Sequence, residues 1–349
     1  YDLLITSYAL LRRDIAQYES IDLNYLVLDE AQHIKNPLTV NAKTCKALRA
    51  DHRLILTGTP VENSLSEVWS LFDFLLPGFL GSRQEFREEY EIEDGLAENR
   101  VRTLAAHIRP FILRRTKTQV LQELPPKIEQ VVYCELAPEQ RLLYDRMHRH
   151  GQEMLYELRR GGWKDRRFEL LSILLRLRQI CCHPALLPQE IQNASRLNGA
   201  PSAKEELARE IILQALDDQH RVLVFSQFVG VLSLFRPWLE EMGIRYEYLD
   251  GSTRDRQERV DRFNSDSGIP VFLLSLKAGG TGLNLTGADT VLHYDQWWNP
   301  MVEDQATDRT HRIGQERPVT ALKLVARHTI EERVLALQES KRELFDQLL

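Results

Sequence analysis

Short runs of apolar residues alternate with helical patterns along this chain, and this alternation constrains its fold more than any other feature. Such alternation is typical of βαβ units, in which crossover helices join parallel strands. Two groups of strands are predicted, over residues 3–7, 25–28, 54–56 and 128–134, and over residues 222–225, 246–249, 271–275, 291–294 and 320–325. We therefore expect an α/β protein built on two parallel sheets.

Helical patterns lie between and within the two groups. One, at about residues 62–118, is broken at Pro77-Gly78 and is predicted to be an insertion on a first lobe. Another covers about residues 138–180 with an interruption at Gly161-Gly162, and residues 184–201 are predicted to form a linker. The predicted domains are a first lobe (1–137), a helical inter-lobe segment with linker (138–201), a second lobe (202–330) and a terminal helix (331–349). This last helix either braces the lobes or caps a sheet.

Length and composition agree with two ordinary globular domains. The chain has 349 residues, of which 43% are apolar and 28% charged. No apolar run approaches the roughly 20 residues that span a bilayer, so we expect no membrane partner. The formal charge of -6 means that any site for a polyanion is a local patch on an acidic body. The four cysteines form no C-x-x-C pair, which favours a reducing compartment.

An acidic pair follows the predicted strand at residues 25–28. Ligands of open α/β sheets bind at the carboxyl ends of strands, where Asp29 and Glu30 would lie. Asp29 could hold Mg²⁺ through water, and Glu30 could orient and deprotonate an attacking water. Farther along, Thr57 follows another strand and could bridge from the acidic pair to a neighbouring lobe. For an isolated Asp-Glu pair, a solvated turn is the more common alternative.

Basic and glycine-rich segments occupy the far end of the chain. Gln305, Arg309 and Arg312 have the spacing of one helix face, and arginine binds phosphoryl oxygens bidentately. The alternative is a salt-bridged surface helix, because acidic residues are close by in the sequence. Ahead of them, residues 278–284 form a Gly-rich loop whose backbone could approach ATP or DNA phosphates, or which could simply need positive φ angles.

The ordered set of these segments resembles the Swi/Snf-type ATPases of helicase superfamily 2. The matching segments are Asp29-Glu30-Ala31-Gln32, Thr57-Gly58-Thr59-Pro60, Ser226-Gln227-Phe228, Asp250-Gly251-Ser252-Thr253, the loop at 278–285, Trp297-Trp298-Asn299-Pro300 and the run from Gln305 to Gln315. The resemblance covers nearly the whole chain. It also includes residues 177–184, which argues against a zinc site at Cys181, Cys182 and His183.

The resemblance implies two RecA-like lobes with ATP and Mg²⁺ between them. Glu30, Arg309 and Arg312 would be catalytic. The nucleotide contacts would be Asp29, which also holds Mg²⁺ through water, Gln32, Thr57, Gly280, Gly282 and Gln305. The residues facing double-stranded DNA, or coupling it to the nucleotide, would be Ser226, Gln227, Gly251, Ser252, Thr281 and Trp298. Ser226 and Ser252 could instead be turn residues, and Trp298 a core aromatic.

The family's phosphate-binding loop, G-x-x-x-x-G-K-[ST], is missing, because no Gly-Lys dipeptide occurs in the sequence. We expect that loop ahead of Tyr1 in a longer, active parent, which would leave the first lobe N-terminally truncated. The alternative is a naturally shortened, inactive relative.

The resemblance implies a DNA-dependent ATPase that translocates on duplex DNA and remodels or displaces bound protein. The fragment by itself is expected to hydrolyse ATP poorly. Two alternatives remain open: a module that binds DNA or protein without turnover, and a true helicase acting on RNA or forked DNA. A cytoplasmic, nucleoid-associated bacterial or archaeal protein is expected, or a nuclear one if the source is a eukaryote.

Overall fold

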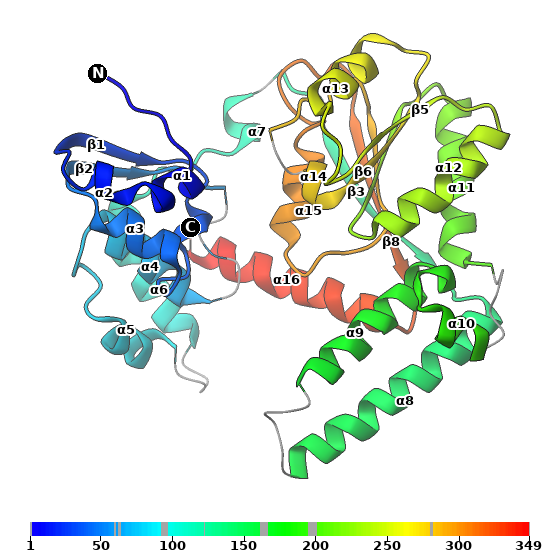
Figure 1. Cartoon of the computed structure of the whole chain (residues 1–349), viewed down its shortest axis with the longest axis horizontal. Coiled ribbons are helices and arrows are strands. Elements are labelled where there is room, and N and C mark those ends of the chain that lie inside the picture. Colours follow the sequence, from blue (N-terminus) through cyan, green and yellow to red (C-terminus); the bar gives the residue numbers. More distant parts are fainter. Residues whose placement is uncertain are drawn as a thin grey trace. The chain divides into compact units, whose positions relative to one another are not determined.

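The computed structural model describes residues 2–58, 61, 64–91, 97–121, 123–160, 167–194, 201–279 and 282–348. The chain forms two compact units, the first made of Tyr1–Arg114 with Ser340–Leu349 and the second of Arg115–Glu339 (Figure 1). The division therefore falls before the strand at residues 127–134, whereas the sequence pattern placed it at residue 137. Helix α16 (Ile330–Leu348) contributes residues to both units.

A parallel two-stranded sheet lies in the first unit. The elements of this unit are α1 (Tyr8–Arg13), α2 (Ile15–Tyr18), β1 (Leu23–Leu28), the 3-10 helix η1 (Ala31–Ile34), α3 (Val40–Ala47), β2 (Ala50–Ile55), α4 (Leu65–Leu75), α5 (Arg83–Tyr90), α6 (Ala97–Ile108) and the 3-10 helix η2 (Arg109–Phe111). The register of β1 and β2 runs from Leu23 opposite Ala50 to Leu28 opposite Ile55. One face of this sheet packs on a core that includes Ile34 and Phe74.

The opposite face of the β1–β2 sheet is open to solvent. Tyr25 is 63% exposed, and the paired residues Val27 and Leu54 are 49% and 47% exposed. Parallel sheets are normally covered on both faces, so this apolar surface is unusual. The strand predicted at residues 3–7 was wrong: these residues are not in a strand, and Leu3 and Ile5 are 76% and 84% exposed. Among the described residues they meet no strand to pair with, and apolar character alone does not make a strand.

Helices α4, α5 and α6 form the predicted insertion of the first unit and have a core of their own. Its buried members include Phe72, Phe86 and Leu104. Helix α4 ends at Leu75, just before the predicted break, and Gly78 there has a φ of 82°, which a residue without a Cβ adopts at little cost. The end of α16 also belongs to this cluster, through Leu344 and Leu348.

Six parallel strands in the order β3-β8-β7-β4-β6-β5 form the centre of the second unit. Its elements are α7 (Lys117–Val120), β3 (Lys127–Cys134), α8 (Pro138–Arg160), α9 (Arg167–Cys182), the 3-10 helix η3 (Pro184–Leu186), α10 (Gln189–Ala194), α11 (Ala203–Asp217), β4 (Val222–Ser226), α12 (Val229–Glu241), β5 (Tyr246–Leu249), α13 (Arg256–Ser265), β6 (Val271–Ser275), α14 (Leu276–Gly279), β7 (Thr290–His293), α15 (Pro300–Thr307), β8 (Val319–Ala326) and α16.

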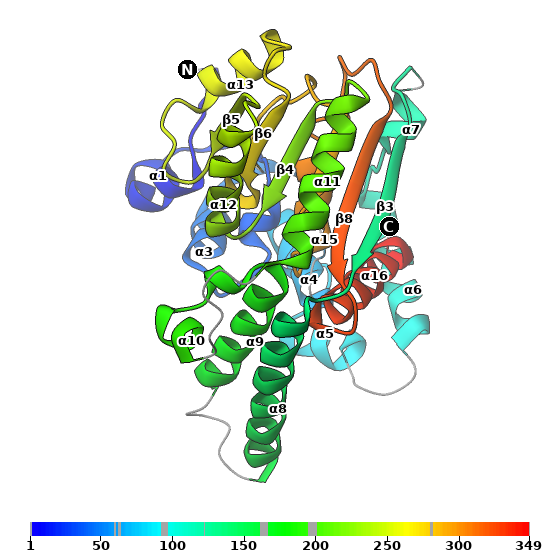
Figure 2. The ribbon, with the colours of Figure 1, turned by 90° about the vertical axis from the view of Figure 1, so that its right-hand side faces the viewer.

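Helices cover both faces of this sheet. Helices α11 and α12 lie on one face, as Figure 2 shows, and α13, α14 and α15 lie on the other. Successive residues of β4 alternate between the two cores, with Val222 and Val224 on the α11–α12 side and Leu223 and Phe225 on the other. This two-sided burial explains why the strands of the second group are continuous apolar runs.

Strand β3 corrects the predicted grouping of strands. It was expected beside the first-lobe strands, but it pairs in parallel with β8 over its whole length, from Lys127 opposite Val319 to Cys134 opposite Ala326. Glu129 of β3 also lies 3.8 Å from the Nζ atom of Lys323 on β8. A local pattern identifies a strand but cannot identify its neighbour, because pairing is decided by residues far away in the sequence.

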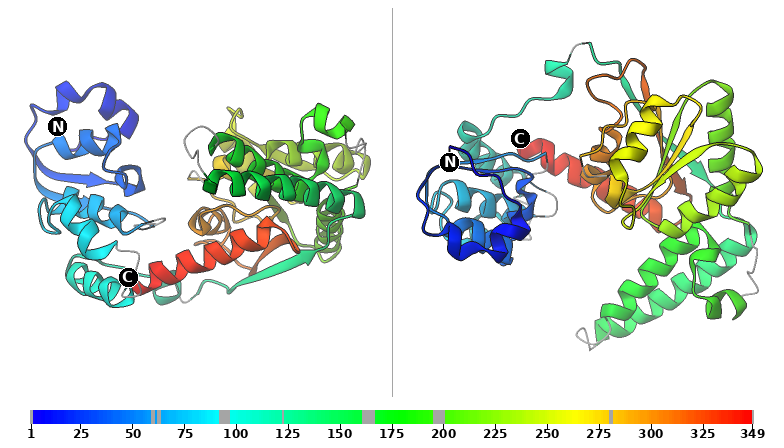
Figure 3. Two further views of the ribbon diagram at one scale, coloured as in Figure 1. Left: turned by 90° about the horizontal axis from the view of Figure 1, so that it is seen from below. Right: turned by 45° about the horizontal axis from the view of Figure 1, so that its top comes forward.

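Helices α8 and α9 lie side by side as an antiparallel pair in the second unit (Figure 3). The predicted linker that follows contains η3 and α10. Cys181 and Cys182 at the end of α9 are fully buried, and burial raises the pKa of both thiols. The described residues hold no cluster of three metal-ligating side chains. Within the same residues, every helix is too short or too polar to cross a membrane.

A buried ion pair connects α11 to the start of α16. The Nζ atom of Lys204 lies 2.5 Å from Oε2 of Glu331, and the two side chains are 0% and 3% exposed. Removing one partner leaves an unpaired buried charge, so Glu331→Ala should lower the free energy of unfolding by about 3–5 kcal/mol. The double variant Lys204→Met/Glu331→Leu should regain most of that loss. Urea unfolding of the three proteins measures both effects, and a single-variant cost within about 0.5 kcal/mol of zero would contradict the burial of this pair.

Candidate nucleotide and DNA site

The acidic pair of the first unit lies directly after β1, as predicted. Both Asp29 and Glu30 are exposed. The Leu56 N–H donates to the Leu28 carbonyl at 2.8 Å, and the Ala31 N–H donates to the Leu56 carbonyl at 3.0 Å. These two bonds extend the β1–β2 pairing beyond the strands, so they hold the acidic turn beside the segment that leads to Thr57.

Glu30 has a left-handed backbone, with φ 50° and ψ 52°, which costs a residue with a Cβ about 1 kcal/mol or more. Its side chain joins a short hydrogen-bonded series. The Gln32 amide donates to Oε2 of Glu30 at 2.8 Å, and the Thr57 hydroxyl donates to Oε1 of Gln32 at 3.2 Å. The structure thus brings together Glu30, which was predicted to be catalytic, with Gln32 and Thr57, which were predicted to contact nucleotide. Gln32 thus holds the carboxylate of the strained residue Glu30.

Tyr8 is a member of this site that the sequence analysis missed. Its hydroxyl donates to the Asp29 carbonyl at 2.7 Å, and its ring lies 5.0 Å from that of His33. Burial and the nearby negative charges of Asp29 and Glu30 raise the pKa of the phenol, so it remains a donor at neutral pH. A tyrosine after an apolar run carries no distinguishing signal in a single sequence.

The arginines of the second unit do not lie on one helix face, which corrects the prediction. Helix α15 ends at Thr307, so Gln305 is helical, whereas Arg309 and Arg312 lie in the turn that follows. Long-range bonds end the helix. The Leu285 N–H donates to the Arg309 carbonyl at 2.9 Å, and the ring of His311 bonds the Pro125 carbonyl at 2.7 Å.

Residues 283–288, after the Gly-rich motif, are joined to the arginine turn by further hydrogen bonds. Arg312 donates to the Leu283 carbonyl at 3.4 Å. The buried amide of Gln315 donates to the carbonyls of Ala288, at 2.7 Å, and Thr310, at 3.2 Å. Gly282 has a φ of 61°, which favours glycine. The predicted site residues Gly280 and Thr281 lie outside the described residues.

A buried carboxylate organises the segments after β4 and β7. Asp295 is 3% exposed and accepts hydrogen bonds from the Ser226 hydroxyl and the Gln227 side-chain amide. Ser226 is the last residue of β4 and is itself 1% exposed, so it lies in a strand rather than in a turn and its hydroxyl is buried against Asp295. Gln227 is half-buried and held by the same carboxylate.

Arg178 of α9 links this carboxylate to the two tryptophans. Its guanidinium lies 3.9 Å from Oδ2 of Asp295 and donates to the Gln296 carbonyl. It also lies 5.1 Å from the ring centroid of Trp298 and 5.9 Å from that of Trp297. Cation–π contacts of this kind hold the half-buried ring of Trp298 in place beside the strand ends.

Gly251 and Ser252 lie in an exposed turn after β5. Asp250 accepts bonds from the Ser252 N–H at 2.8 Å and from its hydroxyl at 2.6 Å, which lowers the pKa of the Asp250 carboxyl to about 2. Such side-chain-to-backbone bonds are typical of Asx turns. The turn residues and the residues around Asp295 share the carboxyl-end edge of the same parallel sheet, although no hydrogen bond connects them among the described residues.

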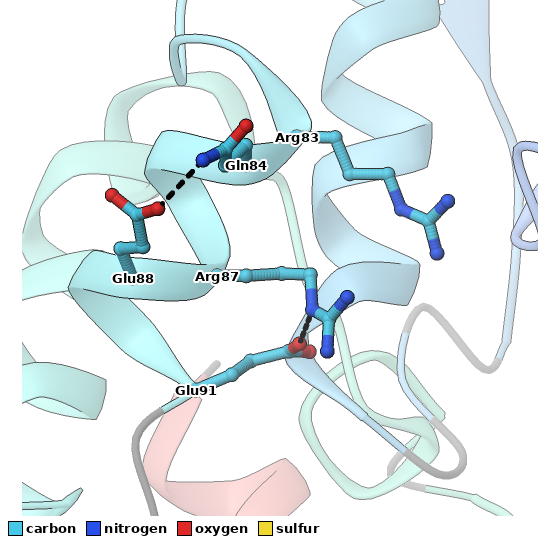
Figure 4. Close-up of a pocket in the computed structure, with 5 residues that line it drawn as sticks. All are labelled: Arg83, Gln84, Arg87, Glu88 and Glu91. Atoms are coloured by element: carbon cyan, nitrogen blue, oxygen red, sulfur yellow. Dashed lines mark hydrogen bonds and ion pairs between the residues drawn. The ribbon is translucent and has the colours of Figure 1, made fainter.

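A separate hollow of about 580 Å³ lies beside α5 in the first unit. Figure 4 shows its lining residues, in which Gln84 bonds Glu88 at 2.9 Å and Arg87 pairs with Glu91 at 3.3 Å. Arg83 reaches past these pairs (Figure 4). Among the described residues, the lining side chains of this hollow belong to no motif, so we do not include it in the candidate site.

The donor set fits ATP and Mg²⁺ in part. The exposed carboxylates of Asp29 and Glu30 suit a hydrated Mg²⁺ ion, which prefers oxygen ligands and keeps several waters. The guanidinium groups of Arg309 and Arg312 suit phosphoryl oxygens. The backbone cradle and lysine that would bind the β and γ phosphates are not among these residues, because the sequence has no Gly-Lys dipeptide.

Comparison with known proteins matches both halves of the chain. Residues 1–186 match the model of the SNF2-related domain, and residues 203–314 match that of the helicase conserved C-terminal domain. An uncharacterized ATP-dependent helicase of Mycoplasma pneumoniae is 40% identical over 350 residues, covering 100% of this chain and 33% of the relative. The TATA-binding protein-associated factor MOT1 of Saccharomyces cerevisiae is 36% identical over 395 residues, covering 97% of this chain and 21% of that protein.

A solved structure is also similar over the whole chain. The SWI2/SNF2 ATPase core of Sulfolobus solfataricus, in complex with double-stranded DNA, is 37% identical with a TM-score of 0.52, covering 100% of this chain and 73% of that one. The likeness identifies the parallel sheets as RecA-like lobes, as predicted. The chain spans about a third of the length of the curated relatives it matches first, at 33%, 33% and 38%.

The buried Asp295 predicts a pH effect on stability. Burial raises the pKa of its carboxyl from 3.8 to about 6, although the Ser226 bond and Arg178 oppose the shift. The folded chain then binds the proton more tightly than the unfolded chain, so this contribution to stability falls as the pH rises from about 4 to 6. As the pH rises across that range, the free energy of unfolding of the wild type should fall by on the order of 2 kcal/mol more than that of Asp295→Asn.

Chemical denaturation of both proteins at several pH values measures this difference. The comparison with the variant is needed because burial lowers the pKa of His293 to about 3 from its usual 6.5, which acts in the opposite direction. A difference between the two proteins that does not change with pH would contradict the shifted pKa of Asp295.

Proposed function

Because this chain belongs to the SNF2 family, we propose that it forms most of an ATP-driven motor that translocates on double-stranded DNA and remodels or displaces bound protein. The observation that carries the proposal is that each unit holds one of two complementary sets of groups. The carboxylates of Asp29 and Glu30 lie at the carboxyl end of β1, where ligands of open α/β sheets bind. Arg309 and Arg312 lie in the turn between α15 and β8 of the second unit.

The proposed reaction is DNA-stimulated hydrolysis of ATP with Mg²⁺. Bound ATP supplies a phosphoanhydride bond whose cleavage releases the free energy for movement. Asp29 would hold Mg²⁺ through a water, and Glu30 would accept a proton from the attacking water. Gln32 keeps the Glu30 carboxylate oriented through its 2.8 Å hydrogen bond. The left-handed backbone of Glu30 supports this assignment, because strained residues with a Cβ cluster at active sites.

Arg309 and Arg312 would neutralise charge that develops on the transferred phosphoryl group. Their turn is anchored to residues 283–288 through the Arg309 carbonyl and through Gln315. It is further anchored to Lys117, which donates to the His311 carbonyl at 2.7 Å and pairs with Asp308 at 2.8 Å. Such anchoring reduces the reorganisation needed when charge appears, which is the main source of electrostatic catalysis.

Duplex DNA would contact the edge formed by the exposed turn at Gly251 and Ser252, with Gln227 and Trp298 nearby on the same sheet. The bound duplex in the Sulfolobus solfataricus relative supports this partner. Contacts to the phosphate backbone are insensitive to base sequence and weaken as salt is raised. The protein that is remodelled remains unassigned by this chemistry.

The first test is catalytic. In the full-length protein, Arg312→Ala should lower DNA-stimulated turnover by about 10³-fold or more with little loss of DNA affinity. Phosphate release and fluorescence anisotropy with a labelled duplex measure the two quantities. Arg317→Ala, which removes an exposed arginine bound to Asp289 instead, is the matched control and should keep its turnover. Unchanged turnover in Arg312→Ala would remove this residue from the active site.

A second test concerns Glu30. Glu30→Gln keeps the size of the side chain but removes the base, so the full-length variant should bind ATP and hold it unhydrolysed. Single-turnover quench experiments with radiolabelled ATP follow the fate of the γ phosphate. Rapid release of ADP by this variant would count against Glu30 as the base.

A non-hydrolysing binding module is the second candidate, and the missing Gly-Lys dipeptide favours it for this chain by itself. We expect the 349-residue chain to bind a duplex but to turn over ATP far more slowly than the full-length protein. Phosphate release from both, with duplex DNA or with RNA, separates the possibilities. Retained DNA binding without turnover in the full-length protein would favour the module, and stimulation by RNA alone would favour a helicase.

A further inference from the structure

A closed ring of three hydrogen bonds holds the peptide backbone of Trp297. Its N–H donates to Oε1 of Glu303 at 2.7 Å, and its carbonyl accepts from the Gln338 amide at 2.6 Å. The same Gln338 amide donates to Oε1 of Glu303 at 2.8 Å, which closes the ring. The three members come from the loop after β7, from α15 and from α16.

This ring is buried and includes a charge. Glu303 and Gln338 are both 0% exposed. The second oxygen of Glu303 lies 3.1 Å from the Nζ atom of Lys323 on β8, and Lys323 is 4% exposed. Oε1 of Gln338 has no hydrogen-bond partner among the described residues, so the ring is held by the three bonds named above. Breaking one of them leaves a further desolvated polar group, which resists rearrangement. A displacement of one member is therefore passed on to the other two.

Each member of the ring continues directly into a different segment, and two of these segments belong to the candidate site. Trp297 precedes Trp298, whose half-buried ring lies at the edge assigned to DNA. Glu303 lies two residues before Gln305 on α15, the helix that leads into the arginine turn. Gln338 lies on α16, which continues into residues that belong to the first unit.

We infer that Glu303 and Gln338 are positioning residues that couple duplex contact at Trp298 to the nucleotide-facing helix α15 and to α16. Neither side chain would touch substrate, because both are fully buried. The inference rests on the proposed function for the reaction that is coupled, but the ring itself can be tested without turnover. A purely structural role would lower stability in the variants and leave the response to DNA unchanged.

The main test variant is Gln338→Met in the full-length protein. Methionine has nearly the volume of glutamine but donates no hydrogen bond, so the variant opens the ring while the Glu303–Lys323 ion pair remains. We expect the ratio of DNA-stimulated to basal ATP turnover to fall about fivefold or more, while basal turnover and duplex affinity change less than about twofold. Amide exchange followed by mass spectrometry should be roughly three- to tenfold faster for the segment containing Trp297.

Two control variants separate coupling from stability. Gln347→Met makes the same replacement at an exposed position of the same helix and should leave both readouts unchanged. Glu331→Gln breaks the buried ion pair with Lys204 near the start of α16, and should lower stability without slowing the response to DNA.

Three results would overturn the inference. In the first, Gln338→Met keeps the wild-type stimulation ratio although amide exchange at Trp297 is faster. In the second, Gln338→Met leaves amide exchange at Trp297 unchanged. The third is an equal loss of stimulation in Glu331→Gln. A wild type without any DNA-stimulated turnover would overturn the proposed function, and the coupling role with it.

Discussion

The parallel pairing of the strands is the constraint on which the rest of this molecule depends. All strands of a parallel sheet end at the same edge, so segments that are far apart in the sequence meet there. In the second unit, this edge collects the ends of β4, β5, β6 and β7, and with them the turn at Ser252, the loop at Gly282 and the tryptophan pair. Parallel sheets are also normally buried on both faces, and in this unit helices on each side supply that burial.

Buried polar and charged side chains then hold the loops that the sheet brings together. Asp295 holds the segment after β4, Arg178 holds the tryptophans, and Gln315 holds the arginine turn against the loop that precedes β7. Each of these groups is buried, with at most 8% of its surface exposed. The exposed side chains are therefore positioned by buried polar groups that ligands do not reach. One set of residues positions the site, and another set is available to bind.

The sequence carried enough information for the fold class, most strands and the order of the motif segments. It also gave the acidic pair, because an apolar run followed by Asp29 and Glu30 is visible locally. It failed where the outcome depended on distant residues. The neighbour of β3 is β8, and the Ser226 hydroxyl is bound by Asp295, both through contacts across tens of residues or more. The helix containing Gln305 ends at Thr307, before Arg309. Tyr8, which bonds the Asp29 carbonyl, had no local signature at all.

The uncovered face of β1 and β2 has a consequence for how the first unit behaves in solution. Tyr25, Val27 and Leu54 form an apolar patch on one face of these strands. In a parallel sheet such a face is normally covered. Any apolar surface that arrives there gains burial, whether it belongs to the same polypeptide, to another copy or to a chaperone. The solubility of this unit therefore depends on which molecule covers the patch.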